Sequence, residues 1–297
     1  MHKWPVIVLR AMRPAQWTKN SLVFAALIFA WADRYQPVDR AHWLVVTVAA
    51  TLFCLLSSAI YLLNDIRDRE QDRLHPQKRM RPIAAGELSV PVAAVVAGVL
   101  AGIALVGGWY GVGTSFAGVL VIYALMQVAY TFGLKRVALV DVFVIAAGFV
   151  LRALAGGVAI QVHISPWLLL CTGLLALFLA LCKRRHEKVI LENVSTVTRD
   201  SMRSYDVRLL DQLIAMVSSA TVVCYALYTL WPDTIDKFGT ARLSFTIPFV
   251  LFGLFRYLDL VYRHEQGGQP ERILLTDWPL IINLLLYGGT VLLVLYV

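Results

Sequence analysis

Long apolar segments follow one another along nearly the whole chain, and short polar segments rich in proline, glycine or charge separate them. Most have the length of a helix that crosses the roughly 30 Å hydrocarbon core of a bilayer, although the first is short. The pattern predicts an all-α integral membrane protein. Its nine transmembrane helices are expected at about residues 18–32, 41–63, 91–109, 114–132, 138–160, 165–182, 209–231, 243–262 and 276–297.

The composition supports a membrane protein and argues against a soluble one. The 297 residues are 59% hydrophobic and only 15% charged, with a mean hydropathy of +0.69, whereas about a quarter of a soluble domain is charged. We therefore expect one transmembrane domain over residues 1–297. The four cysteines lie within apolar runs and are expected to be core residues, not disulfides or zinc ligands.

The basic residues indicate the orientation in the membrane. If the N-terminus is cytoplasmic, 21 of the 27 lysines and arginines fall in cytoplasmic segments. The exceptions are Arg34, Arg40, Lys237 and Arg242 on the opposite side, and Arg152 and Arg256 within spans. Because cytoplasmic loops are enriched in Lys and Arg, this bias favours nine spans in the plasma (inner) membrane with the N-terminus inside. Topology thus accounts for the net charge of +8, and we expect no nucleic-acid partner.

The densest charged segment, residues 64–90, follows the second predicted span. On a helix, Asp65, Asp68 and Asp72 would lie within roughly 60° of one another. Oxygen ligands of this kind suit Mg²⁺, and the adjoining Asn64 can bind or orient the metal. We predict that these four residues bind Mg²⁺ and that the aspartates are catalytic. The alternative is a solvated acidic face at a helix end.

A basic turn follows the aspartates and contains Lys78, Arg79 and Arg81. Guanidinium and ammonium groups are suited to phosphate oxygens. An acidic stripe beside a basic turn therefore predicts a site for a metal-bound diphosphate facing the cytoplasm.

A second cytoplasmic loop, residues 183–208, is more basic than topology requires. Lys183, Arg184, Glu187 and Tyr205 are its candidate substrate-binding residues. It has no second triad of closely spaced carboxylates, so we expect it to receive anions rather than a metal. The alternative is a topology signal alone. The two loops are predicted to close over a shared cavity.

Three further groups of candidate substrate-binding residues have structural alternatives. Gln16, Lys19 and Asn20 precede the first span, where Trp17 could simply anchor the chain at the interface. Tyr130, Lys135 and Arg136 end the fourth span, where the two basic residues could snorkel to the membrane surface. An intramembrane arginine, Arg152, is a functional hypothesis by default. Its partner could be Asp141, a residue of another helix or a substrate phosphate.

The motif Asn64-Asp65-x-x-Asp68-x-x-x-Asp72, after the second span, resembles the first aspartate-rich motif of the UbiA superfamily of intramembrane prenyltransferases. Further segments are similar to the decaprenyl-phosphate phosphoribosyltransferase branch of that superfamily. They are residues 13–20, 72–86, 148–156 and 183–187. The resemblance implies a nine-helix UbiA-like bundle with a cytoplasm-facing cavity and a diphosphate bound through Mg²⁺.

The branch implies a membrane-bound, Mg²⁺-dependent glycosyl (phosphoribosyl) transferase. It would transfer the 5-phosphoribosyl group of 5-phosphoribosyl 1-diphosphate (PRPP) to a polyprenyl (decaprenyl) phosphate and release diphosphate. The product would supply lipid-linked arabinose for cell wall (arabinogalactan) biogenesis. The missing second aspartate-rich motif departs from prenyltransferases proper and favours the phosphoribosyl activity.

Two alternatives remain open at this point. One is a UbiA-type prenyltransferase that moves a polyprenyl group from its diphosphate to an aromatic or other acceptor. The other is a non-catalytic lipid-binding or transport protein. The lipid chain length, the division of the basic residues between the two phosphates, the role of Arg152 and a homo-oligomeric state are also open.

Overall fold

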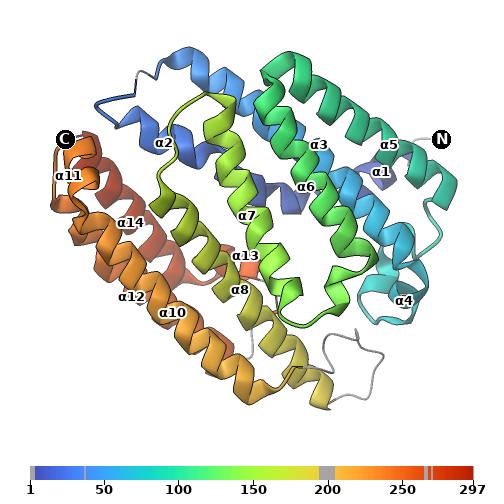
Figure 1. Cartoon of the computed structure of the whole chain (residues 1–297). Coiled ribbons are helices and arrows are strands. Elements are labelled where there is room, and N and C mark those ends of the chain that lie inside the picture. The colour runs from blue at the N-terminus through green and yellow to red at the C-terminus, as the bar shows by residue number, and fades with distance from the viewer. Residues whose placement is uncertain (1–3, 37, 194–204, 264–266, 269, 297) are drawn as a thin grey trace. The chain divides into compact units, whose positions relative to one another are not determined.

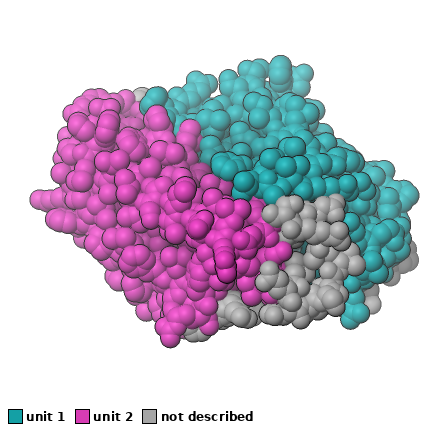
Figure 2. Space-filling view, turned by 60° about the horizontal axis from the view of Figure 1, so that its bottom comes forward, with its two compact units in different colours: residues 1–28, 38–164 teal, residues 29–37, 165–297 magenta. Residues whose placement is uncertain are grey.

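The computed structural model describes residues 4–36, 38–193, 205–263, 267–268 and 270–296. Every regular element among them is helical (Figure 1), which confirms the all-α prediction for this part of the chain. The chain forms two compact units, residues 1–28 with 38–164 and residues 29–37 with 165–297, coloured separately in Figure 2. The prediction of one domain over residues 1–297 stays a prediction.

Unit 1 consists of long helices joined by short helical turns. Its helix α3 contacts α5, α6 and α7, and these helices lie side by side in Figure 1. The elements are α1 (Trp4–Met12), η1 (Pro14–Phe24), the start of α2 (Ala25–Trp31), α3 (Arg40–Arg67), α4 (Arg69–Leu74), η2 (Lys78–Met80), α5 (Val90–Gly107), η3 (Gly108–Val112), α6 (Thr114–Phe132), η4 (Leu134–Arg136) and α7 (Val140–Ala159).

Unit 2 contains the end of α2 and the C-terminal helices. Its helices α8 and α10 contact each other, and α12 contacts both α10 and α14. The elements are α8 (Pro166–Asn193), α10 (Val207–Leu230), α11 (Pro232–Phe238), η5 (Arg242–Thr246), α12 (Ile247–Arg263), α13 (Pro270–Thr276) and α14 (Trp278–Tyr296).

Eight helical stretches among the described residues are long and apolar enough to cross a membrane, so the chain is a multi-pass membrane protein. Each overlaps one of the predicted spans from the second to the ninth. They are Arg40–Arg67, Val90–Val112, Thr114–Phe132, Val140–Ala159, Pro166–Ile190, Val207–Leu230, Arg242–Arg263 and Trp278–Tyr296.

The predicted first span, 18–32, is not one of these helices. It is divided between the 3₁₀ helix η1 and the short α-helix α2. Two hydroxyl groups in η1 bond to backbone carbonyls three residues earlier: Thr18 Oγ1 donates to Ala15 O at 3.1 Å and Ser21 Oγ donates to Thr18 O at 2.7 Å. Such local bonds compete with regular α-helical geometry. The polar start of this segment therefore forms a tighter helix than hydropathy alone predicts.

η1 packs closely against α7 at a glycine. A Cβ atom on Gly156 would collide with the carbonyl oxygen of Val23 in η1. Only glycine permits this approach of the two backbones, as is common between membrane helices. The contact fixes η1 against the centre of unit 1.

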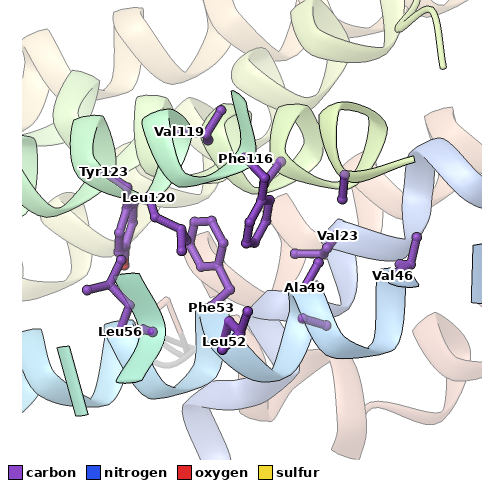
Figure 3. Packing of buried hydrophobic residues seen from close by; sticks show 14 of the residues in the cluster. Val23, Val46, Ala49, Leu52, Phe53, Leu56, Phe116, Val119, Leu120 and Tyr123 are labelled. Atoms are coloured by element: carbon purple, nitrogen blue, oxygen red, sulfur yellow. The ribbon is translucent and has the colours of Figure 1, made fainter. Parts of the chain in front are cut away.

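The core of unit 1 lies where α3 meets α6. Figure 3 shows Phe53 of α3 pointing toward Leu120 and Tyr123 of α6. The rings of Phe53 and Tyr123 have centroids 4.7 Å apart, and all three side chains are buried. This packing holds α3 and, at its end, the aspartate motif.

In unit 2, the loop after α2 is held by charged groups. Asp33 Oδ2 accepts a bond of 3.0 Å from Lys237 Nζ, and the Tyr35 hydroxyl donates to Asp236 Oδ2 at 2.9 Å. Burial alone would raise the pKa of Asp33. Hydrogen bonds from Gln36, the Tyr35 amide and Lys237 outweigh burial and hold this pKa below its ordinary value. These bonds tie residues 33–36 to α11.

Candidate functional site

The aspartate motif lies at the junction of α3 and α4. Asn64 and Asp65 are in the last turn of α3, Asp68 is at the junction with φ −93° and ψ 5°, and Asp72 is in α4. The predicted single helical stripe is therefore interrupted at Asp68. The backbone still donates from Asp68 N to Asn64 O at 2.9 Å and from Asp72 N to Asp68 O at 2.8 Å, so the three carboxylates remain on neighbouring turns.

Each of these carboxylates binds a positively charged side chain from another segment. Arg81 Nη1 donates to Asp65 Oδ1 at 3.1 Å and to Asp72 Oδ2 at 2.6 Å. Arg13 also binds Asp65, and Lys135 binds Asp68. We call these six residues the carboxylate–cation cluster. Its formal charge is zero, with three carboxylates facing three cations.

Lys135 links the cluster to the neighbouring amide as well. Its ammonium group donates to Asn64 Oδ1 at 3.3 Å. Lys135 lies in η4, which follows α6, and is only 5% exposed. The next residue, Arg136, is exposed. The sequence predicted that both residues bind substrate. In the structure, Lys135 contacts the aspartate motif.

Arg13 is a member of this cluster that the sequence did not single out. It separates α1 from η1 with φ 56° and ψ 62°, a left-handed conformation that costs a non-glycine residue about 1–3 kcal/mol. Its guanidinium also lies 5.2 Å from the ring centroid of Tyr61. The available signal was the Arg13-Pro14 pair, because a proline disfavours the right-handed helical region for the residue before it.

A cavity of about 230 Å³ opens beside Asp65. Three arginines contribute to its wall, so positive charge exceeds negative charge around it. The lining residues are Arg10, Arg13, Asp65, Gln77, Met80, Arg81 and Pro82. Of the predicted basic turn, Arg81 lines this cavity, Lys78 is half-buried, and Arg79 is exposed in η2.

Two other predicted site residues come together away from the aspartates. Arg152 Nε donates to Asn20 Oδ1 at 2.8 Å, Nη1 to Gly148 O at 2.7 Å and Nη2 to the Tyr123 hydroxyl at 2.8 Å. Its guanidinium carbon lies 5.4, 4.9 and 5.5 Å from the ring centroids of Phe53, Tyr123 and Phe149. We call this the Arg152 cluster. Every described partner of Arg152 is neutral.

Asn20 is fully enclosed by this cluster and by α3. It is 2% exposed, and its amide donates to Cys54 Sγ at 3.1 Å and to Ser57 Oγ at 3.3 Å. Gln16 and Lys19, also on η1, are half-buried, as is Tyr130 on α6. The structure thus joins Asn20 to Arg152, while substrate binding by these residues stays a prediction.

The second basic segment belongs to unit 2 and continues α8. The predicted span ends at residue 182, but the helix continues to Asn193, so Lys183, Arg184 and Glu187 are helical. Arg184 is 3% exposed and bound to Glu187, and Tyr205 is also buried. The i, i+3 pair favours helix over loop here. Residues 194–204 of the predicted loop lie outside the described residues.

The ligand chemistry of the aspartate motif fits a hard divalent cation. Asn64, Asp65, Asp68 and Asp72 present the oxygen donors that Mg²⁺ prefers. In the described part of the chain, no three acidic, histidine or cysteine side chains are arranged as ligands of one metal ion. The carboxylates instead take the cation-paired arrangement described above.

The fold is thus an all-helical membrane fold with an aspartate motif at the junction of α3 and α4. Residues 21–275 match the UbiA prenyltransferase family, and the chain belongs to this family.

Within this family, the chain is similar over nearly its full length to decaprenyl-phosphate phosphoribosyltransferases. It is 39% identical to the protein of Mycolicibacterium smegmatis over 96% of this chain and 91% of that one. It is 38% identical to that of Mycobacterium tuberculosis over 96% and 92%, and 35% identical to that of Corynebacterium glutamicum over 98% and 87%.

The fold is also similar to that of a solved UbiA homolog from Archaeoglobus fulgidus bound to GPP and Mg²⁺. The TM-score is 0.72 at 18% identity, covering 98% of this chain and 100% of the other. At this identity the likeness shows the fold alone.

Proposed function

We propose that this chain transfers the 5-phosphoribosyl group of PRPP to decaprenyl phosphate or a related polyprenyl phosphate, with release of diphosphate. One observation carries the proposal: the named phosphoribosyltransferases are 35–39% identical over nearly the whole chain. The product would be a lipid-linked sugar precursor for cell wall arabinan.

The chain would cross the membrane nine times, with its N-terminus and active site on the cytoplasmic side. η1 has 11 residues and α2 has 7. At about 2.0 Å and 1.5 Å per residue they extend over roughly 32 Å, which matches the hydrocarbon core. The mixed helix Pro14–Trp31 is therefore long enough for the ninth crossing. The basic residues before it and after α3 favour this orientation.

Asn64, Asp65, Asp68 and Asp72 would hold Mg²⁺ at the diphosphate of PRPP. A bound Mg²⁺ supplies positive charge that favours departure of a diphosphate leaving group. In the solved homolog from Archaeoglobus fulgidus, GPP and Mg²⁺ are bound together, which supports a metal-dependent diphosphate site in this fold.

The cationic residues would position both phosphate-bearing substrates. Arg81 and Lys135 lie against the aspartates and would donate to the leaving diphosphate as the C1–O bond of the ribose breaks. The lipid phosphate is already ionised near neutral pH, so its attack needs no strong general base. Of the remaining basic candidates, Lys78, Arg79 and Arg136 of unit 1 would orient the ribose 5-phosphate and the lipid phosphate. Lys183 and Arg184 of unit 2 stay candidates for anion binding.

The test is a transfer assay with the full chain in lipid nanodiscs. Radiolabelled PRPP is offered with decaprenyl phosphate and Mg²⁺, and a parallel reaction offers polyprenyl diphosphate with 4-hydroxybenzoate. We expect labelled lipid and released diphosphate in the first reaction. Product in the second reaction alone would identify a prenyltransferase. No diphosphate release in either would leave a non-catalytic protein as the better explanation.

A further inference from the structure

The carboxylate–cation cluster has a charge balance that bears on how the metal enters. Its three carboxylates already face three cations, and Asp65 and Asp72 are 2% and 4% exposed. A divalent cation added alone would leave an excess positive charge in a largely desolvated site, where charge is costly. A metal that arrives with a diphosphate brings its own negative charge and avoids this excess.

The three cations come from segments other than those that carry the carboxylates. Arg13 lies between α1 and η1, Arg81 follows η2, and Lys135 is in η4, whereas the aspartates belong to α3, α4 and their junction. Each cation can therefore change partner by a side-chain rotation, without a change in the backbone that carries the aspartates.

There is also space for such an exchange beside Asp65. The side chains of Arg13 and Arg81 are 24% and 25% exposed, and both line the cavity of about 230 Å³. This volume is well above the roughly 15 Å³ that a single bound water needs. Anionic oxygens in the cavity would meet these guanidinium groups, and Asp65 lines the same cavity.

We propose that Arg13, Arg81 and Lys135 are exchangeable counter-ions of the aspartate motif. They bind Asp65, Asp72 and Asp68 in the metal-free site and pass to phosphate oxygens when the metal–diphosphate complex binds. Metal alone therefore binds weakly, and metal and diphosphate bind cooperatively. This inference deepens the proposed function, because it assumes that a metal-bound diphosphate is a ligand of this site.

If the three cations are exchangeable counter-ions, removing one should change two affinities in opposite directions. A purely structural role of the cation would not produce this result. Removing one counter-ion lowers the positive charge that faces the carboxylates, so the affinity for metal alone should rise. The same change removes a phosphate donor, so the affinity for the metal–diphosphate complex should fall. Coupling free energies between linked sites commonly correspond to about 5- to 150-fold in affinity.

The experiment titrates Mn²⁺ into the full-length protein in nanodiscs, with bound metal measured by electron paramagnetic resonance. Titrations are made without and with inorganic pyrophosphate at buffered free metal. For the wild type we expect weak binding of Mn²⁺ alone and at least about fivefold tighter binding with pyrophosphate. For Lys135→Gln and Arg13→Gln we expect tighter binding of Mn²⁺ alone and a smaller effect of pyrophosphate.

Two controls separate charge from position. Lys135→Arg keeps the charge and should keep the weak binding of Mn²⁺ alone. Arg67→Gln removes one charge from an exposed arginine in the last turn of α3 whose described contact is the ring of Phe132, and should change neither titration. If one glutamine variant does not fold, the other carries the test.

Tight binding of Mn²⁺ alone to the wild type would overturn the proposal. Weaker binding of Mn²⁺ alone to both glutamine variants would also overturn it. Neither result depends on the lipid acceptor or on turnover. Failure of transfer from PRPP to polyprenyl phosphate is measured separately and would refute the proposed function instead.

Discussion

At the α3–α4 junction, Arg13, Arg81 and Lys135 each bind a carboxylate, whereas Arg152 of α7 binds neutral groups and aromatic rings among its described partners. The side chain of Arg13 is 24% exposed, but Arg152 as a whole is 5% exposed. Both clusters belong to unit 1. They show two ways in which this unit stabilises positive charge.

The two clusters differ in whether a ligand can replace the partners of their cations. A phosphate offers Arg13 or Arg81 charge-assisted bonds of the same kind as a carboxylate, so it can replace the carboxylate as their partner. The three neutral acceptors of Arg152 come from η1, α6 and α7 and are held by packing. We infer that the carboxylate–cation cluster binds ligands and that the Arg152 cluster fixes three helices relative to one another.

The largest effect is expected for Asp65→Asn. The change keeps the side-chain shape but removes the charge that Arg13 and Arg81 both meet. We expect transfer from PRPP to fall by about a hundredfold or more, the range seen when a group that stabilises transition-state charge is lost. The measurement is kcat/KM in nanodiscs with Mg²⁺ present.

Glu70→Gln is the matched control for this change. Glu70 is an exposed acid on α4 whose carboxylate pairs with Arg73 at 3.3 Å, so its loss should leave transfer near the wild-type rate. Wild-type transfer by Asp65→Asn would refute the metal-binding role of this aspartate.

The next largest effect is expected for Gly156→Ala. The added Cβ would meet the carbonyl oxygen of Val23, and the overpacking should cost about 1–3 kcal/mol of stability. The measurement is the thermal unfolding midpoint of the purified protein. Gly102→Ala in α5, where a Cβ meets nothing within 4 Å, should be neutral or slightly stabilising. Equal midpoints for the two variants would mean that η1 does not pack against α7 as described.

Features that involve residues close together in the sequence could be predicted, whereas contacts between residues far apart in the sequence could not. The aspartate motif and the eight long apolar helical stretches follow from hydropathy and residue spacing, which are local. The pairing of Asn20 with Arg152 joins residues 132 positions apart, and no local pattern encodes it. The sequence offered each as a substrate contact, because a buried polar residue looks the same whether its partner is a ligand or another helix.

Two predicted spans differ in their bounds or helix type from the helices of the structure, and in both cases the reason is local bonding. The first predicted span became partly 3₁₀ because polar residues of η1 bond locally, which hydropathy does not register. α8 continues past Cys182 because its charged residues pair along the helix, as Arg184 does with Glu187. A run of charged residues after an apolar segment therefore indicates where the membrane span ends, but the helix itself can continue through these residues.

A smaller effect tests the role of Arg152 directly. Arg152→Met removes three hydrogen bonds and the ring contacts from a packed site, which should cost about 2 kcal/mol of stability. Because the described partners of Arg152 are protein groups, the KM for PRPP of the folded variant should stay near that of the wild type. A large rise in KM with an unchanged unfolding midpoint would instead place Arg152 at the substrate. That outcome would remove the distinction between the two clusters.

The smallest effect separates the backbone of Arg13 from its guanidinium. Arg13→Gly and Arg13→Ala both lose the bond to Asp65, so both should lose the same PRPP affinity. They differ at the left-handed backbone, where φ is 56° and a Cβ costs roughly 1–2 kcal/mol. The glycine variant should therefore unfold at the higher temperature, the reverse of the order expected in a helix, where glycine is about 1 kcal/mol less favourable than alanine. The opposite order would mean that α1 and η1 are not separated by a left-handed residue, and that Arg13 reaches Asp65 from a continuous helix.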